Sequence, residues 1–246
     1  MPFTPAHVSI VLPLLRIRPQ LISATALVIG SIAPDFEYFL KMSVSAEHGH
    51  TLLGIFYFDI PITIVSAFLF HGLVKRNLIA NLPVFFQYRF QEVVSLDFKQ
   101  YFKSHYWVVM ISAGVGSFSH IVWDAFTHNN GFFVQRISLY KQVSIPFDGV
   151  RYPLFYALQH LSTIVGLTIL ILYIWFMKER KNIPVNRPSF SYWANILLIS
   201  CSVIFLRFGF NMQSLNLGDF VVSSISAILV AVFIGGLVKF KSASSF

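Results

Sequence analysis

The sequence contains little charge and almost no cysteine. Charged residues make up 11% of the 246 residues, against about 25% in an ordinary soluble domain. The one cysteine, Cys201, lies inside an apolar run, so the sequence excludes both a disulfide framework and a cysteine metal cluster. Ten Asp and Glu stand against 18 Lys and Arg. Because no compact basic domain carries this excess of positive charge, we expect no nucleic-acid partner.

Hydrophobic residues are abundant where charged residues are few. They form 56% of the chain, Phe alone occurs 27 times, and the mean hydropathy is +0.69. A chain of this length has room for one helical bundle and no separate soluble domain. We therefore predict an all-α integral membrane protein that forms a single polytopic domain over 1–246. Membrane lipid is its expected partner, and a homo-oligomer is an option that the sequence leaves open.

Five apolar runs are long enough to cross a bilayer, which takes about 20 residues. They cover 55–74, 106–124, 154–176, 193–210 and 220–238. The apolar run 21–34 is shorter and ends at Pro34. We expect 1–34 to form a re-entrant or interfacial helical segment, and the bundle to hold five to six transmembrane helices, depending on whether 21–34 crosses. Arg16 and Arg18 follow the first apolar stretch, an order that argues against a cleaved secretory signal.

Lys and Arg alternate between the connecting loops. Loop 75–105 carries five and loop 177–192 carries four, whereas 125–153 carries three and 211–219 none. The positive-inside rule therefore predicts a multi-pass protein of the cytoplasmic (inner) membrane, with 75–105, 177–192 and the C-terminus in the cytoplasm. The mixture of aromatic and charged residues in 75–105 is typical of an interfacial helix.

Imidazole and carboxylate groups recur at helical spacing around the end of the run 106–124. His120, Asp124 and His128 stand at i, i+4 and i+8, so a helix places them on one face. Ionisable groups at membrane depth are costly and usually face the bundle interior or a wet cavity. The predicted topology gathers further such groups on the same, extracytoplasmic side: Asp35, His48, His50, Asp59 and His160. This collection from distant segments predicts a functional site, and the imidazoles and carboxylate on one helix face resemble half of a metal site.

Several short motifs follow one another in the order seen in a known family. They are Thr4-Pro5-Ala6-His7, Ala33-Pro34-Asp35, His50-Thr51-Leu52-Leu53, and Gly116 to Thr127 followed by Gly131. Over 1–165 the chain resembles bacterial inner-membrane proteins of the YdjM type, described as membrane-bound, metal-dependent hydrolases of the LexA regulon. It is similar, more closely, to an uncharacterised relative, a domain of unknown function whose members open Met-Pro-Phe-Thr-Pro-Ala-His. Those members also carry a segment like Leu158-Gln159-His160-Leu161-Ser162. The accessory helices over 190–240 add nothing specific.

The resemblance implies a set of metal ligands. The positions that match the family motifs are His7, Asp35, His50, His120 and Asp124. The family has Pro-Asp-x-Asp-His where this chain has Pro34-Asp35-Phe36-Glu37-Tyr38, so one expected His is missing. His128 and His160 are local additions that we expect to replace missing nitrogen ligands.

A ligand set of imidazoles and carboxylates favours zinc or a similar ion with one position open for water. Asp35 or Glu37 then serves as a general base, and Asp35 fits a ligand role equally well. The expected substrate is a phospholipid or another amphipathic ester. The alternative is a non-enzymatic membrane scaffold or lipid-binding protein, in which these polar residues only hold helices together.

Overall fold

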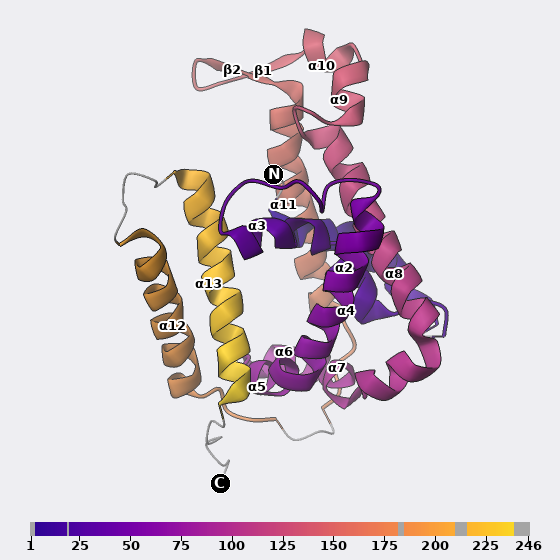
Figure 1. Ribbon diagram of the computed structural model, residues 1–246, viewed down its shortest axis with the longest axis vertical. Helices are drawn as coiled ribbons and strands as arrows, with labels where there is room; N and C mark the ends of the chain where they lie inside the picture. Colours follow the sequence, from indigo (N-terminus) through magenta and orange to yellow (C-terminus); the bar gives the residue numbers. More distant parts are fainter. Residues whose placement is uncertain (1–2, 19, 182–184, 210–215, 239–246) are drawn as a thin grey trace. The chain divides into compact units, whose positions relative to one another are not determined.

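The computed structural model describes residues 3–18, 20–181, 185–209 and 216–238, and it is mostly helical (Figure 1). Within these ranges, five helical stretches are long and apolar enough to cross a membrane. They are Ile55–Ala80, Phe98–Arg136, Leu154–Trp175, Phe190–Phe208 and Leu217–Leu237. This confirms the predicted fold class. Phe210, the predicted end of the fourth span, and the C-terminal tail from 239 lie outside the described residues.

The chain folds into two compact units, each assembled from three chain segments. The first unit comprises 1–35, 47–64 and 105–176, and the second comprises 36–46, 65–104 and 177–246. Helix α8 (Phe98–Thr127) contributes to both. Its backbone leaves helical values at His105, with φ −134° and ψ 31°, which is where the chain passes from one unit to the other. All the side chains that form the candidate site belong to the first unit.

The first unit begins with a series of short helices. They are η1 (Thr4–His7), α1 (Val8–Val11), η2 (Leu12–Arg16), α2 (Ala24–Gly30) and η3 (Ala33–Asp35). Pro5 and Pro13 stand in the first turns of η1 and η2, where a missing N–H costs nothing. The longest of these helices, α2, has seven residues and rises only about 10 Å. Among the described residues of 1–34, therefore, each helix by itself is too short to cross a bilayer.

Helix α2 packs against α8 with its backbone in close approach. A Cβ added at Gly30 would lie 2.5 Å from the carbonyl oxygen of Ala113. A Cβ added at Gly116 would lie 2.4 Å from the carbonyl oxygen of Leu27 and 2.7 Å from the nitrogen of Ser31. Small residues permit such contacts between helices. The two glycines thereby bring the end of α2 directly against the region of α8 that carries His120.

The predicted span 55–74 begins with a π-helical turn and continues beyond its predicted end. It comprises η4 (Ile55–Asp59), α4 (Ile60–Leu69), η5 (Phe70–Val74) and α5 (Lys75–Ala80). The loop that precedes it, 47–54, carries His50. Likewise, α8 begins at Phe98, eight residues before the predicted start at 106. Lys99 and Lys103 lower the hydropathy of this first stretch without preventing a helix.

The loop predicted over 125–153 contains regular structure. Two short helices, α9 (Phe132–Arg136) and α10 (Leu139–Gln142), precede a hairpin of β1 (Ser144–Phe147) and β2 (Val150–Pro153). The turn residues Asp148 and Gly149 have φ of +47° and +74°, values that a tight two-residue hairpin turn requires. This hairpin is a local addition to the helical fold, and its turn of Asp148 and Gly149 between apolar residues is a hairpin signal. Helix α11 (Leu154–Trp175) follows β2 immediately.

The second unit is built around two long helices. Helices α12 (Phe190–Phe208) and α13 (Leu217–Leu237) pack together through Tyr192, Ile196 and Ala231. The unit also contains η5, α5 and the short helices α3 (Phe36–Lys41), α6 (Val84–Arg89) and α7 (Gln91–Ser95). The predicted interfacial helix over 75–105 is thus a succession of short helices that leads into α8.

Candidate metal centre

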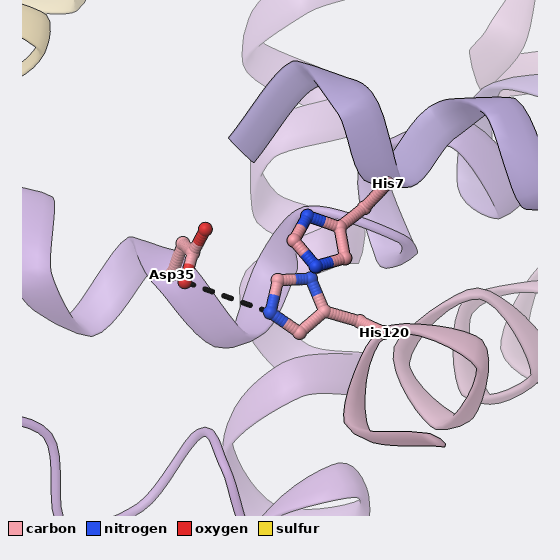
Figure 2. Close-up of side chains that lie close together, drawn as sticks. All are labelled: His7, Asp35 and His120. Carbon is pink, nitrogen blue, oxygen red and sulfur yellow. Dashed lines mark ion pairs between the residues drawn. The ribbon is translucent and has the colours of Figure 1, made fainter. Parts of the chain in front are cut away.

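The structure brings five of the predicted ligands together. The ligand atoms of His7, Asp35 and His120 lie within 4.8 Å of one another, and so do those of His50, His120 and Asp124. Figure 2 shows the first of these sets. His7 ends η1, Asp35 ends η3, His50 lies in a loop, and His120 and Asp124 stand one turn apart on α8. Segments far apart in the sequence therefore bring together groups of side chains that could hold a metal ion.

Four of the atoms form a closed ring of nitrogen and oxygen. His50 Nε2 lies 3.3 Å from Asp35 Oδ1 and 3.6 Å from Asp124 Oδ2. His120 Nε2 lies 3.6 Å from Asp35 Oδ1 and 3.4 Å from Asp124 Oδ2. A tetrahedral ion with ligands at about 2.0–2.1 Å separates neighbouring ligand atoms by about 3.3–3.4 Å. The four nitrogen–oxygen distances are therefore close to the separation of neighbouring ligands around one divalent ion.

The hydrogen bonding of His120 leaves its Nε2 directed at carboxylate oxygens. Its Nδ1 lies 2.9 Å from the carbonyl oxygen of Ser31. Since a carbonyl only accepts, Nδ1 carries a proton, and Nε2 would present a lone pair to an ion once the ring has lost its second proton. Among the described residues, His120 Nε2, Asp35 Oδ1 and Asp124 Oδ2 are buried without a hydrogen-bond partner. Buried polar atoms of this kind are rare and costly, and a cation between them satisfies all three.

The other oxygen of each carboxylate is held by the first turn of the chain. Thr4 Oγ1 donates to Asp35 Oδ2 at 2.5 Å, and His7 Nε2 lies 3.1 Å from Asp124 Oδ1. The His7 ring also stacks on that of His120, with centroids 3.8 Å apart (Figure 2). Outer contacts of this kind fix the orientation of metal-ligating side chains. The single turn Thr4–His7 therefore orients both carboxylates.

The residues outside the spans have charge states that suit a cation. Burial by itself raises the pKa of Asp35, but the charge of His120 and the contact with His50 hold that pKa below its ordinary value. Burial lowers the pKa of His7, and the nearby His120 lowers it further, against the opposing contact with Asp124. A carboxylate that stays ionised and an imidazole that stays neutral are the forms that take part in metal binding.

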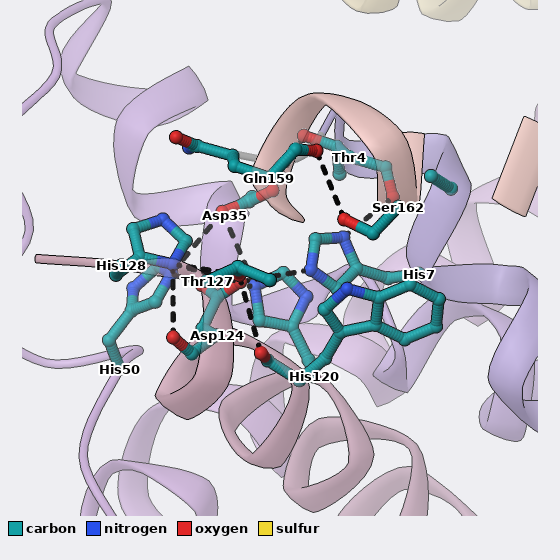
Figure 3. A network of polar contacts seen from close by, with 12 residues as sticks. Thr4, His7, Asp35, His50, His120, Asp124, Thr127, His128, Gln159 and Ser162 are labelled. Carbon is teal, nitrogen blue, oxygen red and sulfur yellow. Dashed lines mark hydrogen bonds and ion pairs between the residues drawn. The ribbon is translucent and has the colours of Figure 1, made fainter. Parts of the chain in front are cut away.

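The site is most open beside His50 and His128. The side chains of His50 and His128 are 23% and 28% exposed, whereas those of Asp35 and His120 are fully buried. His128 Nδ1 lies 3.2 Å from the backbone oxygen and 3.3 Å from Oδ1 of Asp124. Figure 3 shows the rings of His50 and His128 next to each other. Among the described residues, His128 Nε2 has no hydrogen-bond partner.

Two predicted site residues, His160 and Glu37, do not belong to these groups of ligand atoms. His160 is exposed on α11, with its ring against the edge of Tyr156 at 4.5 Å. The neighbouring residue, Gln159, is buried. Because successive residues of a helix are about 100° apart around its axis, the side chain of His160 is directed outwards. Glu37 belongs to the second unit, where its carboxylate is 2.8 Å from Lys41 Nζ. The structure thus does not bring His160 into the ligand set, and the role of Glu37 as a general base stays a prediction.

Two further polar residues, which the predicted topology puts on the extracytoplasmic side, make contacts outside the group of ligand atoms. Asp59 is fully buried and accepts a short hydrogen bond from Ser117 on α8. His48 Nδ1 lies 3.0 Å from the hydroxyl of Tyr57. Thr4, by contrast, is a functional candidate that sequence reasoning did not assign. Its position in the same Thr-Pro-Ala-His turn as His7 is the signal that could have identified it.

Comparison with known proteins adds one match. Residues 1–237 match the family model described as a domain of unknown function (DUF4184). No curated protein and no solved structure matches the chain. The match extends beyond the motif-bearing segment 1–165 and takes in the accessory helices of the second unit.

Proposed function

We propose that this chain, which belongs to the DUF4184 family of unknown function, is a membrane-embedded metal-dependent hydrolase. The observation that carries the proposal is the ring of His50 Nε2, His120 Nε2, Asp35 Oδ1 and Asp124 Oδ2, with edges of 3.3–3.6 Å. The similarity to YdjM-type membrane-bound hydrolases supports the same interpretation. Two imidazoles and two carboxylates at this spacing favour zinc among the common divalent ions.

A bound divalent ion would supply a Lewis acid that polarises an ester or phosphoryl oxygen and acidifies water. The protein's own contribution is to hold the ion and to orient the side chains that bind it. Asp35 and Asp124 each present one oxygen to the centre of the ring while Thr4 and His7 hold the other. Because one oxygen of Asp35 accepts from Thr4 and the other faces the ion site, we propose that the proton would be accepted by His128, whose buried Nε2 has no hydrogen-bond partner among the described residues.

The substrate class follows from where the site lies along the chain. His120 and Asp124 stand on a helix that is long and apolar enough to cross a membrane, near the end that leads into 125–153. The alternating charge of the loops supports an extracytoplasmic position for this end in the cytoplasmic membrane, and we include it in the proposal. An ester that reaches such a site is amphipathic, with its polar group at the interface, and we therefore propose a phospholipid or a similar lipid ester.

A second candidate function rests on the number of protein ligands. Four protein ligands are typical of a closed, structural zinc site, whereas a catalytic site keeps one position open. In that case the ion would hold the first unit together, and the protein would be a membrane scaffold without hydrolase activity. The distinction depends on whether the partly exposed His50 stays bound to the ion.

The test is a measurement of metal content and lipid turnover on the same preparation. Protein reconstituted in phosphatidylethanolamine and phosphatidylglycerol is assayed for zinc by mass spectrometry and for released headgroup or fatty acid. We expect close to one zinc per chain and zinc-dependent release, both lost in His120→Ala and in Asp124→Asn. His160→Ala, which changes an exposed His on α11, is the matched control and keeps both. Bound zinc without turnover of either lipid would support the scaffold, and folded protein that binds no zinc would refute both candidates.

A further inference from the structure

The hairpin between α10 and α11 has two chemically different faces. Because successive side chains alternate along a strand, cross-strand partners share a face. One face carries the pairs Ile145–Tyr152 and Phe147–Val150, and the other carries Ser144–Pro153 and Pro146–Arg151. Arg151 donates to Ser144 Oγ at 3.2 Å across this second face. The hairpin is therefore a ribbon with an apolar side and a more polar side.

The apolar side is open in the structure. Phe147 is 73% exposed, Val150 51% and Ile145 39%. A single two-stranded hairpin is only marginally stable in water, and grouped exposed apolar side chains mark an interaction surface. Such a face calls for a cover that the chain's own described residues do not provide.

The position of the hairpin along the chain indicates what contacts its apolar side. Strand β2 ends at Pro153, and α11, one of the candidate spans, begins at the next residue. Val150 is thus at most about 13 Å from the start of a membrane helix, at about 3.3 Å per strand residue. Figure 1 shows the hairpin running across the end of α11 instead of continuing along its axis. A ribbon so attached lies at the depth of the headgroup layer.

Two neighbouring features fit this depth. Tyr152 stacks on Tyr156 in the first turn of α11, with centroids 5.4 Å apart and planes 14° from parallel. Tyr is enriched where membrane helices enter the interface, since its ring is apolar and its hydroxyl polar. The segment 125–153 also carries three basic residues, all exposed, against Asp148 as its one acidic residue. Basic residues beside a bilayer attract anionic headgroups.

We propose that the hairpin 144–153 is a membrane-surface anchor, which inserts Ile145, Phe147 and Val150 into the headgroup–acyl boundary of a phospholipid bilayer. Arg136 and Lys141 precede the hairpin, Arg151 lies on its more polar side, and all three contact lipid phosphates. The anchor fixes the depth of the first unit, and with it the depth of the metal centre. The inference does not depend on the proposed hydrolase activity, because it rests on the hairpin and the span that follows it.

The experiment measures which residues of the hairpin meet lipid. Single cysteines are introduced in a Cys201→Ser background by Ser144→Cys, Ile145→Cys, Pro146→Cys and Phe147→Cys, and each is spin-labelled. The proteins are reconstituted in bilayers of phosphatidylglycerol and phosphatidylethanolamine. Collision rates with oxygen, which concentrates in lipid, and with a water-soluble nickel chelate are then compared. These positions are on the surface of the hairpin, so the labels leave the packed helices intact.

We expect the oxygen-to-nickel collision ratio to alternate, with higher values at 145 and 147 than at 144 and 146. Adding Phe147→Ser to the protein labelled at 145 lowers the ratio at 145. Equally high nickel accessibility at all four positions would place the hairpin in water and overturn the proposal. Low accessibility to both reagents along both faces would also overturn it, because it would indicate a covering protein chain.

Discussion

Replacing Thr4 with valine removes the hydroxyl that holds one of the two carboxylates and leaves the size of the side chain almost unchanged. Thr4 is 7% exposed and Asp35 fully buried, and the hydroxyl donates to Asp35 Oδ2 at 2.5 Å. A short bond to a charged acceptor is among the stronger hydrogen bonds in proteins. In Thr4→Val this oxygen loses its donor, and the carboxylate is able to turn away from His50 and His120.

The size of the effect follows from the position of Thr4 behind a ligand. Losing an outer contact to a metal ligand typically costs about 10–100-fold in metal affinity, which corresponds to about 1.4–2.7 kcal/mol. Leaving a buried acceptor without its donor costs a further about 1–3 kcal/mol in stability. We therefore expect Thr4→Val to bind zinc at least tenfold more weakly than the unchanged protein, and to unfold at a lower temperature.

The assay is competition for zinc with a chromogenic chelator in detergent solution, together with a thermal melt of the same sample. Thr4→Ser is the matched control, since it keeps the hydroxyl and loses only a methyl group. It should retain most of the zinc affinity. Equal zinc affinity in Thr4→Val and the unchanged protein would refute the idea that this turn orients the site. Equal losses in Thr4→Ser and Thr4→Val would show that packing, not the hydrogen bond, is what matters.

Two further predictions concern the metal and the helix contact beneath it. Removing the metal with a chelator should lower the melting temperature reversibly, because an ion at a hundred times its Kd stabilises the folded state by about 2.7 kcal/mol. A melting temperature that is the same with and without zinc would contradict a bound ion. Gly116→Ala should destabilise by about 1–3 kcal/mol and weaken zinc binding, since its Cβ would lie 2.7 Å from the nitrogen of Ser31. Gly114→Ala, whose Cβ first meets Ile60 Cδ1 at 3.4 Å, is its control, and equal effects of both substitutions would argue against the role of this contact.

The fold was predictable because bilayer crossing imposes a simple composition rule. Each apolar run of about 20 residues corresponds to a helix, and the five predicted spans all have one among the described residues. The helix ends were less predictable. Helix α8 starts at Phe98, before its apolar stretch, because helix formation tolerates Lys where membrane insertion does not. The hairpin around Asp148 and Gly149 had a local signal, but an interpretation based on hydropathy treats such a segment as a loop.

The site was predictable where its residues share one helix. His120 and Asp124 stand four residues apart, so their common face follows from helical geometry alone. The rest of the site depends on tertiary contacts that spacing does not encode. The close approach at Gly116 fixes the Ser31 carbonyl against His120. His160 is a residue that sequence reasoning wrongly expected in the ligand set. Its direction depends on the rotation of α11 about its axis, which a short sequence motif does not determine.

His50 is the ligand that separates a catalytic site from a structural one. It lies on the loop 47–54 and its side chain is 23% exposed, whereas His120 is fully buried on a helix. If substrate displaces one ligand from the ion, displacing His50 requires the least free energy, because it is partly exposed and lies on a loop. We therefore expect His50→Gly to keep bound zinc at reduced affinity, and His120→Ala to lose it.

Free imidazole provides the sharper version of this test. In His50→Gly it fills the vacated space beside Asp35 and Asp124, and zinc affinity should rise with its concentration. The control is His160→Gly, in which imidazole has no effect. Complete loss of zinc from His50→Gly, with no recovery in imidazole, would mean that the four ligands act as one closed set. The ion would then serve the fold, since a closed tetrahedral site offers no position for a reacting group.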